Sequence, residues 1–323
     1  MPLPLEGIRV TDLAVVWSGP MAATLLADLG AEVIHLENLR HPPTLTRGVL
    51  LRPTREQSLL LGPLGSGYPD HEPGQRPWNR TAMFNAHGRN KRCATVDLTQ
   101  ASGHEIFLRL IEKSDVFIEN NARTTLEHLG LDATVLFEVN PRLILLRMPP
   151  LGLEGPFAAY RGFGPTFNSL AGVTAMGGYH DADLTSQGDN YHMDEAAAPA
   201  AAFAVMAGLW RREQSGTGQL IEFPQVENLI QQLGEYLIAF QLTAEEPPLY
   251  GNRDPYLVQG VYPCPGSDRW IAISLRDDAD WAALKRAMGA PAWAEMEIFS
   301  THLLRMHNQN ALDERIAAWT STL

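Results

Sequence analysis

One carboxylate in the sequence stands where covalent chemistry could take place. Asp194 directly precedes Glu195 and an uncharged run, residues 196–210, that is typical of a buried helix. A carboxylate at a helix start caps the helix by accepting backbone N–H bonds, and for Asp194 alone this interpretation is favoured. The same donors would keep the group ionised and make it a carboxylate nucleophile. The small side chains of residues 196–198 would then let a bulky substrate come close.

A compact basic cluster on a loop before a predicted strand could bind phosphate. Its members are contiguous: Arg89, Asn90, Lys91 and Arg92. Guanidinium and ammonium groups match phosphate oxygens in charge and geometry. Isolated cations elsewhere, such as Arg47, are interpreted as solvated surface charges.

Three other patterns in the sequence do not predict a catalytic or cofactor site. The histidines show no HxxxH or HExxH spacing, so the sequence predicts no metal site. Ser215-Gly216-Thr217-Gly218 is no nucleophile elbow and is interpreted as a turn leading into a strand. Glu37 ends a predicted strand, as the acid of a dinucleotide site does, but the preceding turn VVWSGP lacks GxGxxG. Glu37 is therefore interpreted as a strand-end charge or a helix cap.

The elements that must position these groups alternate between strands and helices. Strands predicted at 7–13 and 31–37 flank a helix at 21–30 that ends at a glycine. This βαβ unit favours a parallel sheet and an α/β fold. The pattern repeats with predicted strands at 95–98, 115–120 and 142–148 and helices at 101–113 and around Leu136. Residues 38–90, rich in Pro, Gly and Arg, are predicted to form a long functional or mobile loop.

The composition changes toward the end of the chain. After the uncharged run, GTGQLIEFP predicts a strand and VENLIQQLGEYLIAF a long helix. The stretch EEPPLYGNRDP, residues 245–255, is a predicted linker. Beyond it, GVYPC and RWIAISL predict strands, and DDADWAALKRAMG predicts a helix. The 323 residues are therefore expected to form a large Rossmann-like domain, 1–244, and a small α/β domain, 256–323.

Charge and composition exclude several classes of partner. The net charge of −12 disfavours nucleic acid, although a local basic pocket could still hold a small anion. The uncharged run is shorter than the roughly 18–20 residues that span a bilayer, so no membrane segment is predicted. Cys93 and Cys264 lie far apart, and the N-terminal sequence has no signal-peptide pattern. These features favour a cytoplasmic protein.

Taken in order, these segments resemble the class III CoA-transferases, a CaiB/BaiF-type family that includes formyl-CoA transferase, carnitine CoA-transferase and alpha-methylacyl-CoA racemase. The segments that carry the resemblance are PLEGIRVTDL, SGPMAATLLADLGAEVIHLE, NKRCATVDL, SDVFIEN, LGLDATVLFEVNPRLI, GLEGP, GDNYHMDEAA and LWRREQSGTGQLIE. GNRDPYLVQGVYPC and DDADWAALKRAMG extend it more weakly. Each motif is weak alone, but the ordered set covers nearly the whole chain.

The resemblance implies a CoA-transferase with Asp194 as its nucleophile. The family's catalytic aspartate opens the helix that ends before TGxGQ, and counting back from Arg212 places it at Asp194. In the implied reaction the carboxylate attacks an acyl-CoA to give a mixed anhydride and CoA thiolate. The thiolate then forms an aspartyl thioester, and an acceptor acid reverses the steps. A carboxylate of low pKa in a closed site suits this chemistry.

Two alternatives stay open. By the same resemblance, the racemase branch pairs this aspartate with a histidine that is followed by an aspartate. The corresponding segment of this chain reads Arg161-Gly162-Phe163-Gly164, so Phe163 takes the place of the histidine and Gly164 that of the acid. Racemisation needs proton-transfer groups on both faces of the α-carbon, and phenylalanine cannot serve. The transferase interpretation is therefore favoured over a racemase or isomerase. The second alternative is a catalytically inactive CoA-binding homologue.

The resemblance also implies which residues contact coenzyme A. By position these are Trp17, Asn38, Asn120, Asn121 and His128, together with Asn90, Lys91, Arg92 and Arg161. The second group keeps the polar or basic character expected around the phosphates and adenine. The glycine-rich loop that shields the aspartate in formyl-CoA transferase has no obvious counterpart, and GNRDPYLVQG stands near its place.

The implied partners are an acyl-CoA, a carboxylic acid and a second copy of the chain. Family members continue beyond the point where AAWTSTL stands here, and their continuation returns to the large domain and interlocks two subunits. The small domain is therefore expected to lack this return segment. A homodimer is expected, with an oligomeric state that depends on that segment.

Overall fold

A computed structural model describes residues 2–40, 44–60, 67–179, 182–183, 191–246 and 248–323. The chain divides into two compact units. Unit 1 comprises Met1–Gly172 and Asp189–Ile238, and unit 2 comprises Val173–Gly188 and Ala239–Leu323. The division predicted from the sequence, with a linker at 245–255, stays a prediction. Within the described ranges, no helix is both long and apolar enough to cross a membrane.

Unit 1 is built on a six-stranded sheet, ordered β3-β2-β1-β4-β5-β6, in which every pair is parallel. The strands are β1 (Arg9–Asp12), β2 (Glu32–Glu37), β3 (Lys91–Thr95), β4 (Val116–Glu119), β5 (Ile144–Arg147) and β6 (Gln219–Glu222). The chain builds outward from β1 to β3, then restarts beside β1 at β4. This order is that of a Rossmann-like sheet, so the predicted fold class is confirmed.

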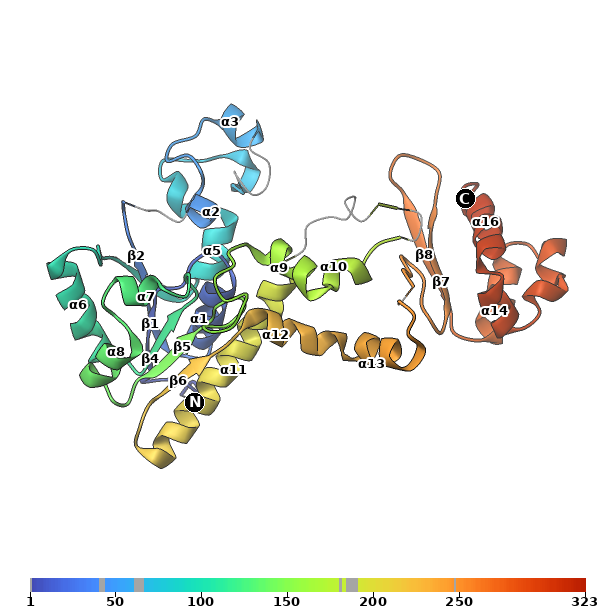
Figure 1. Ribbon diagram of the computed structural model, residues 1–323. Coiled ribbons are helices and arrows are strands. Elements are labelled where there is room, and N and C mark those ends of the chain that lie inside the picture. Colours follow the sequence, from blue (N-terminus) through green and yellow to red (C-terminus); the bar gives the residue numbers. More distant parts are fainter. Residues whose placement is uncertain (1, 41–43, 61–66, 180–181, 184–190, 247) are drawn as a thin grey trace. The chain divides into compact units, whose positions relative to one another are not determined.

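Helices cover both faces of this sheet (Figure 1). One face packs against α1 (Ser18–Asp28) and α11 (His192–Ser215). The other packs against α6 (Ala101–Ile111), α7 (Thr125–His128) and α8 (Ala133–Val139). Strand alternation divides the side chains between the two cores: Val116 and Ile118 face α1 and α11, whereas Phe117 faces the other helices.

Most predicted elements of unit 1 are present, with three differences. The third strand is Lys91–Thr95 rather than 95–98, so the basic cluster begins the strand instead of preceding it. The first helix begins at Ser18 rather than 21, because Pro20 is tolerated in a first turn. The segment 38–90 is not simply a loop. It contains short helices: α2 (Thr44–Arg47), α3 (Arg55–Leu60), η1 (Pro69–His71), η2 (Pro77–Asn79) and α5 (Ala82–Gly88).

The prediction of one long helix after β6 is wrong. The structure has α12 (Gln225–Ile230), a 3-10 turn at Gln231–Leu233, and α13 (Gly234–Thr243). The break lies directly before Gly234, and glycine has low helix propensity. Two further helices follow the sheet's fifth strand: α9 (Gly164–Ala171) and α10 (Val173–Met176).

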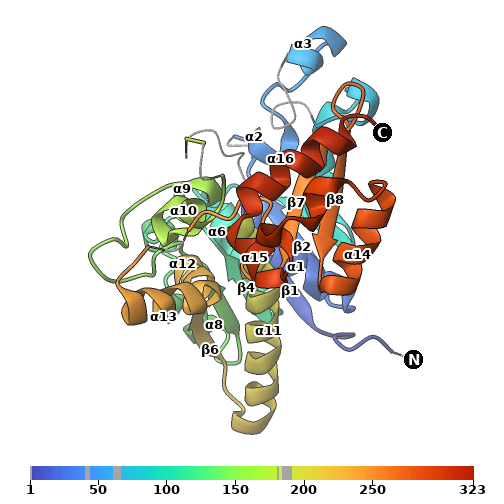
Figure 2. The same ribbon diagram turned by 90° about the vertical axis from the view of Figure 1, so that its right-hand side faces the viewer.

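Unit 2 contains a two-stranded antiparallel sheet with helices against it (Figure 2). The predicted strands and helix are present as β7 (Val258–Pro263), β8 (Trp270–Leu275) and α14 (Asp278–Ala287). They are followed by η5 (Ala292–Glu295), η6 (Glu297–Phe299), α15 (His302–His307) and α16 (Gln309–Thr320). Trp281, Phe299, Leu312 and Ile316 form the centre of this unit's own apolar core.

Candidate functional site

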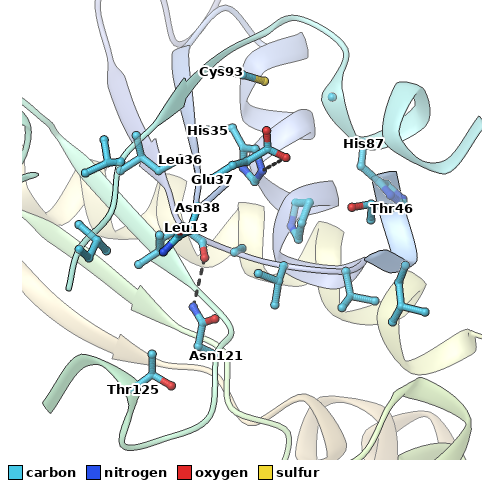
Figure 3. A pocket seen from close by; sticks show the side chains of 18 of the residues that line it. Leu13, His35, Leu36, Glu37, Asn38, Thr46, His87, Cys93, Asn121 and Thr125 are labelled. Atoms are coloured by element: carbon cyan, nitrogen blue, oxygen red, sulfur yellow. Dashed lines mark hydrogen bonds and ion pairs between the residues drawn. The ribbon is translucent and has the colours of Figure 1, made fainter. Parts of the chain in front are cut away.

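A cavity of about 490 Å³ opens in unit 1 at the carboxyl ends of the parallel strands (Figure 3). Residues that directly follow β1, β2, β3 and β4 line it, and α5 closes one side. The lining includes Leu13, Val15, Val16, Pro20, His35, Glu37, Asn38, Thr46, Phe84, His87, Cys93, Asn121 and Phe163. The strand order reverses between β1 and β4, and open α/β sheets bind ligands in the crevice at such a point.

Glu37 supplies a charged group to the cavity wall. It accepts two hydrogen bonds from the guanidinium of Arg47, one of them 2.8 Å from Nε to Oε1. Arg47 also lies over the ring of Phe84, with 3.4 Å between the guanidinium carbon and the ring centroid. The interpretations of Glu37 as a simple strand-end charge and of Arg47 as an isolated surface cation are therefore wrong. The pair ties α2 to the end of β2.

A second set of ionic contacts lies beneath α1, at the end of β1. Lys91 Nζ lies 2.9 Å from Asp12 Oδ2 and 2.6 Å from the carbonyl oxygen of Pro20. His35 Nδ1 also lies 2.9 Å from Asp12 Oδ2. Burial raises the pKa of Asp12, but Lys91 and His35 outweigh it and lower the pKa to about 2. Lys91 is thus part of a buried ion pair.

Asp194 lies in the first turn of α11, with only 7% of its surface exposed. Its carboxylate faces the N-terminus of α1, where the backbone N–H and the hydroxyl of Ser18 hydrogen-bond to it. The residue at the cap position of α11 is Tyr191, and Asp194 is the third residue of the helix. The interpretation of Asp194 as the cap of its own helix is therefore wrong. It interacts with the start of a neighbouring helix instead.

The electrostatics of Asp194 also differ from the expectation. Burial raises the pKa of this carboxyl to about 6, and the two hydrogen bonds from Ser18 counteract only part of that effect. The expectation of a low pKa is therefore wrong. A carboxylate with this pKa is largely ionised at neutral pH, and it is a stronger base and nucleophile than an ordinary aspartate.

Glycine at position 164 leaves the room that the Asp194 carboxylate occupies. A Cβ atom built on Gly164 would lie 2.2 Å from Asp194 Oδ2, which is shorter than any tolerated contact. Phe163, the preceding residue, lines the cavity and is 58% exposed. The segment in which the racemase branch would carry a His-Asp pair therefore lies directly against Asp194, and it offers no proton-transfer side chain.

Three aromatic rings stand in a row between the cavity and the start of α11. The ring of Trp17 stacks on Tyr191, with centroids 4.7 Å apart and planes 15° from parallel. On its other side Trp17 contacts the ring of His87, at 4.9 Å between centroids. Trp17 Nε1 and His87 Nδ1 are both buried and have no hydrogen-bond partner within the described part of the chain.

The structure brings several of the residues expected to contact CoA to this region. Asn38 and Asn121 line the large cavity. Asn120 hydrogen-bonds to Val15, which lines the cavity. Its Oδ1 accepts a hydrogen bond from Val15 N at 2.7 Å, and its Nδ2 donates one to the Val15 carbonyl oxygen at 2.9 Å. Arg161 lies with both asparagines around a second hollow of about 330 Å³.

Four other expected residues lie elsewhere. Asn90, Lys91 and Arg92 stand at the amino end of β3, and each hydrogen-bonds a carboxylate of the protein: Asp28, Asp12 and Glu32 respectively. The cavity lies at the carboxyl ends of the strands, so these three residues do not line it. His128 is an exposed residue at the end of α7 and does not line it either.

Ser18, His87 and the Glu37–Arg47 pair are features of this site that the sequence did not reveal. Ser18 and Asp194 are far apart in the chain, and only the packing of α1 on α11 joins them. His87 carries no spacing motif. A signal for Ser18 did exist, because the SGP start of α1 places a serine at a helix N-terminus. In the described ranges no three His, Cys, Asp or Glu residues gather as a metal site would require.

Comparison with known proteins gives consistent matches. The family model for "CoA-transferase family III" matches residues 5–323. The chain is 32% identical to succinyl-CoA--D-citramalate CoA-transferase of Chloroflexus aurantiacus, over 99% of this chain and 73% of that protein. It is 30% identical to the beta subunit of succinyl-CoA--L-malate CoA-transferase of the same organism, over 99% and 74%. A crystal structure of a CAIB/BAIF family protein from Brucella suis superposes with a TM-score of 0.84 at 26% identity, covering 99% of this chain and 79% of that one.

Proposed function

The chain belongs to CoA-transferase family III, and we propose that it transfers CoA between an acyl-CoA thioester and a carboxylic acid through a covalent intermediate on Asp194. The observation that carries this proposal is the setting of that carboxylate. It is buried against the N-terminus of α1 and has a pKa near 6, at one end of an aromatic row that leads to the cavity. These features suit a nucleophile that must be ionised yet weakly solvated.

The proposed exchange takes place in successive steps on Asp194. A carboxylate oxygen of Asp194 attacks the thioester carbonyl carbon, the C–S bond breaks, and CoA leaves as a thiolate. The thiolate attacks the aspartyl carbonyl of the mixed anhydride, which forms an aspartyl thioester and releases the donor acid. The acceptor carboxylate then reverses both steps and leaves with CoA. The positive end of α1 lies beside the negative charge that moves during these steps.

We propose that at least one of the two acids is dicarboxylic. The relatives named above act on succinyl-CoA together with D-citramalate or L-malate, according to their names. For CoA we propose contacts with Asn38, Asn120, Asn121 and Arg161, which lie around the two hollows, and with Trp17, whose ring contacts the cavity-lining His87. For Asn90, Lys91, Arg92 and His128 the geometry lends no support to such a role.

Trapping with hydroxylamine tests the covalent mechanism. The protein is mixed with succinyl-CoA, quenched with hydroxylamine and digested, and peptides are analysed by mass spectrometry. An aspartyl anhydride or thioester yields a hydroxamate on the peptide that contains Asp194, and Asp194→Asn yields none. In Asp194→Asn we expect CoA exchange to be lost while CoA binding persists. Wild-type exchange rates in that variant would overturn the mechanism.

The racemase alternative predicts a different isotope result. A racemase exchanges the α-hydrogen of its acyl-CoA with solvent, so deuterium from D₂O would enter that carbon. Phe163 and Gly164 supply no second proton-transfer group beside Asp194, so we expect no incorporation. Binding of CoA without exchange or deuteration would instead support an inactive homologue. A cytoplasmic location stays part of the proposal, supported by two cysteines that are both unpaired.

A further inference from the structure

Two buried nitrogen atoms beside the candidate nucleophile have no partner. Trp17 Nε1 can only donate a hydrogen bond, and His87 Nδ1 can donate or accept according to its tautomer. Buried polar groups in folded proteins are almost always paired, because leaving one unpaired costs free energy. Here two such groups belong to rings in direct contact, 4.9 Å apart between centroids. Such a pair is expected where a ligand supplies the missing partner.

The surroundings of the two rings point the same way. His87 is 92% buried, since only 8% of its surface is exposed, and it lines the large cavity. Trp17 directly precedes Ser18, which hydrogen-bonds Asp194, and its ring stacks on Tyr191 at the start of the Asp194 helix. The two rings therefore lie between the cavity wall at His87 and the start of the helix that carries Asp194.

We propose that His87 and Trp17 recognise a second oxygen-bearing group, a carboxyl, carbonyl or hydroxyl, on the acid whose acyl group is transferred. This inference rests on the proposed function, because it takes the reacting carbonyl to lie at Asp194. The two nitrogens would then hydrogen-bond an oxygen further along the acyl chain. The rings themselves would pack against its methylene carbons.

The charge state of His87 decides the kind of recognition. Burial lowers the pKa of this imidazole to about 4, and the positive charges of Lys91 and Arg89 add to that effect. The ring is therefore neutral at neutral pH, and it offers a hydrogen bond rather than a cation. Its backbone is fixed, because Thr24 Oγ1 donates to the His87 carbonyl oxygen at 2.6 Å. The group is thus positioned before a ligand arrives.

Three donors with the same four-carbon acyl chain test this inference. Succinyl-CoA carries a terminal carboxyl, 3-hydroxybutyryl-CoA a hydroxyl, and butyryl-CoA neither. We expect the wild type to prefer the two oxygenated donors over butyryl-CoA by roughly 10–100-fold in kcat/KM. His87→Phe should lose most of that preference, with little change for butyryl-CoA or in the affinity for CoA, and Trp17→Phe should lose most of the same preference. The matched control is His104→Phe, a substitution on α6, which covers the opposite face of the sheet. This variant should keep the wild-type preference for the oxygenated donors.

If kcat/KM of His87→Phe fell equally with all three donors, His87 would only support the fold and the inference would be overturned. A wild type with no preference for the oxygenated donors would also overturn it. If no donor is turned over, the proposed function fails and binding decides the inference alone. The probe is then the indole N–H resonance of Trp17 in ¹⁵N-labelled protein, assigned by its absence in Trp17→Phe. A shift on adding succinate but not butyrate, abolished by His87→Phe, would support the inference. Equal responses to both acids, or none, would overturn it.

Discussion

Asp194 and Ser18 form a unit in which one side chain sets the pH range of the other. In the proposed mechanism the carboxyl must be ionised to attack, so its pKa of about 6 predicts an acylation rate that falls about tenfold per pH unit below 6 and levels off above it. Ser18→Ala removes a hydrogen bond that lowers this pKa. The acid limb should therefore move to higher pH in the variant, as measured by rapid-quench acylation with succinyl-CoA.

The control for this prediction is Ser102→Ala, an exposed serine on α6. Its acid limb should coincide with that of the wild type. An unchanged midpoint in Ser18→Ala would mean that the hydroxyl does not act on the nucleophile.

Gly164 tests the geometry around the same carboxylate. In Gly164→Ala the new methyl group would lie 2.2 Å from Asp194 Oδ2, so the carboxylate must move. A displacement of about an ångström at a reacting group costs on the order of 10²-fold in rate, so kcat should fall by that amount. Gly234→Ala is the matched control, since nothing lies within 4 Å of its added Cβ. Equal kcat values for the two variants would contradict the assigned position of the carboxylate.

Contacts between residues far apart in the chain could not be predicted from the sequence. Asp194 was identified because a local helix start and an ordered set of motifs both point to it. Its raised pKa was not predictable, because burial and the Ser18 contact arise only when α1 packs on α11. His87 and Trp17 were equally hidden as a pair, since their contact depends on how α5 meets the end of β1.

Strands with a strong local sequence pattern were predicted more accurately than strands whose position depends on packing. The apolar strands β4 and β5 were predicted within two residues at each end, because buried parallel strands are continuous apolar runs. β3 was placed too late in the sequence because it is an edge strand with charged residues. The basic residues at its start therefore looked like a phosphate-binding loop, although in the structure they pair with neighbouring carboxylates.

Lys91 tests whether β3 is held by that pairing. The Lys91 side chain is 1% exposed and Asp12 is fully buried, so Lys91→Met would leave this buried carboxylate without its lysine partner, while the contacts from His35 and the Ala14 N–H remain. We expect the free energy of unfolding to fall by about 3–5 kcal/mol in urea titrations at pH 7. Because the pKa of folded Asp12 is lowered to about 2, its contribution is present at neutral pH and is lost as the pH falls toward 2.

Arg92→Met is the comparison, since Arg92 is 78% exposed and its ion pair with Glu32 is worth at most about 1 kcal/mol. If Lys91→Met kept wild-type stability but lost CoA affinity, the phosphate role would be restored and the structural one rejected.

Helix α11 carries an exposed apolar face that the sequence did not predict. Phe203 and Trp210 are 68% and 69% exposed and, seven residues apart, lie on one face of this helix, which was expected to be wholly buried. We propose that a second copy of the chain covers this face. The double variant Phe203→Glu/Trp210→Glu should then sediment as a monomer where the wild type sediments as a dimer.

The control is Ile106→Glu on α6, which introduces the same charge at another exposed apolar position. It should leave the dimer intact. If the wild type sedimented as a monomer, or if the double variant still sedimented as a dimer, this face of α11 would not be the contact between two copies of the chain.

The path of the chain through its two units has a consequence for biosynthesis. The chain leaves unit 1 after Gly172 and returns at Asp189, while the rest of unit 2 begins only at Ala239. At roughly 5–20 residues per second, a ribosome needs several seconds to pass from the first portion of unit 2 to the completion of the second. During that interval α1 and α11 have both emerged and can pack together. The helix that carries Asp194 can therefore pack in place while the unit that the chain entered just before it is still being synthesised.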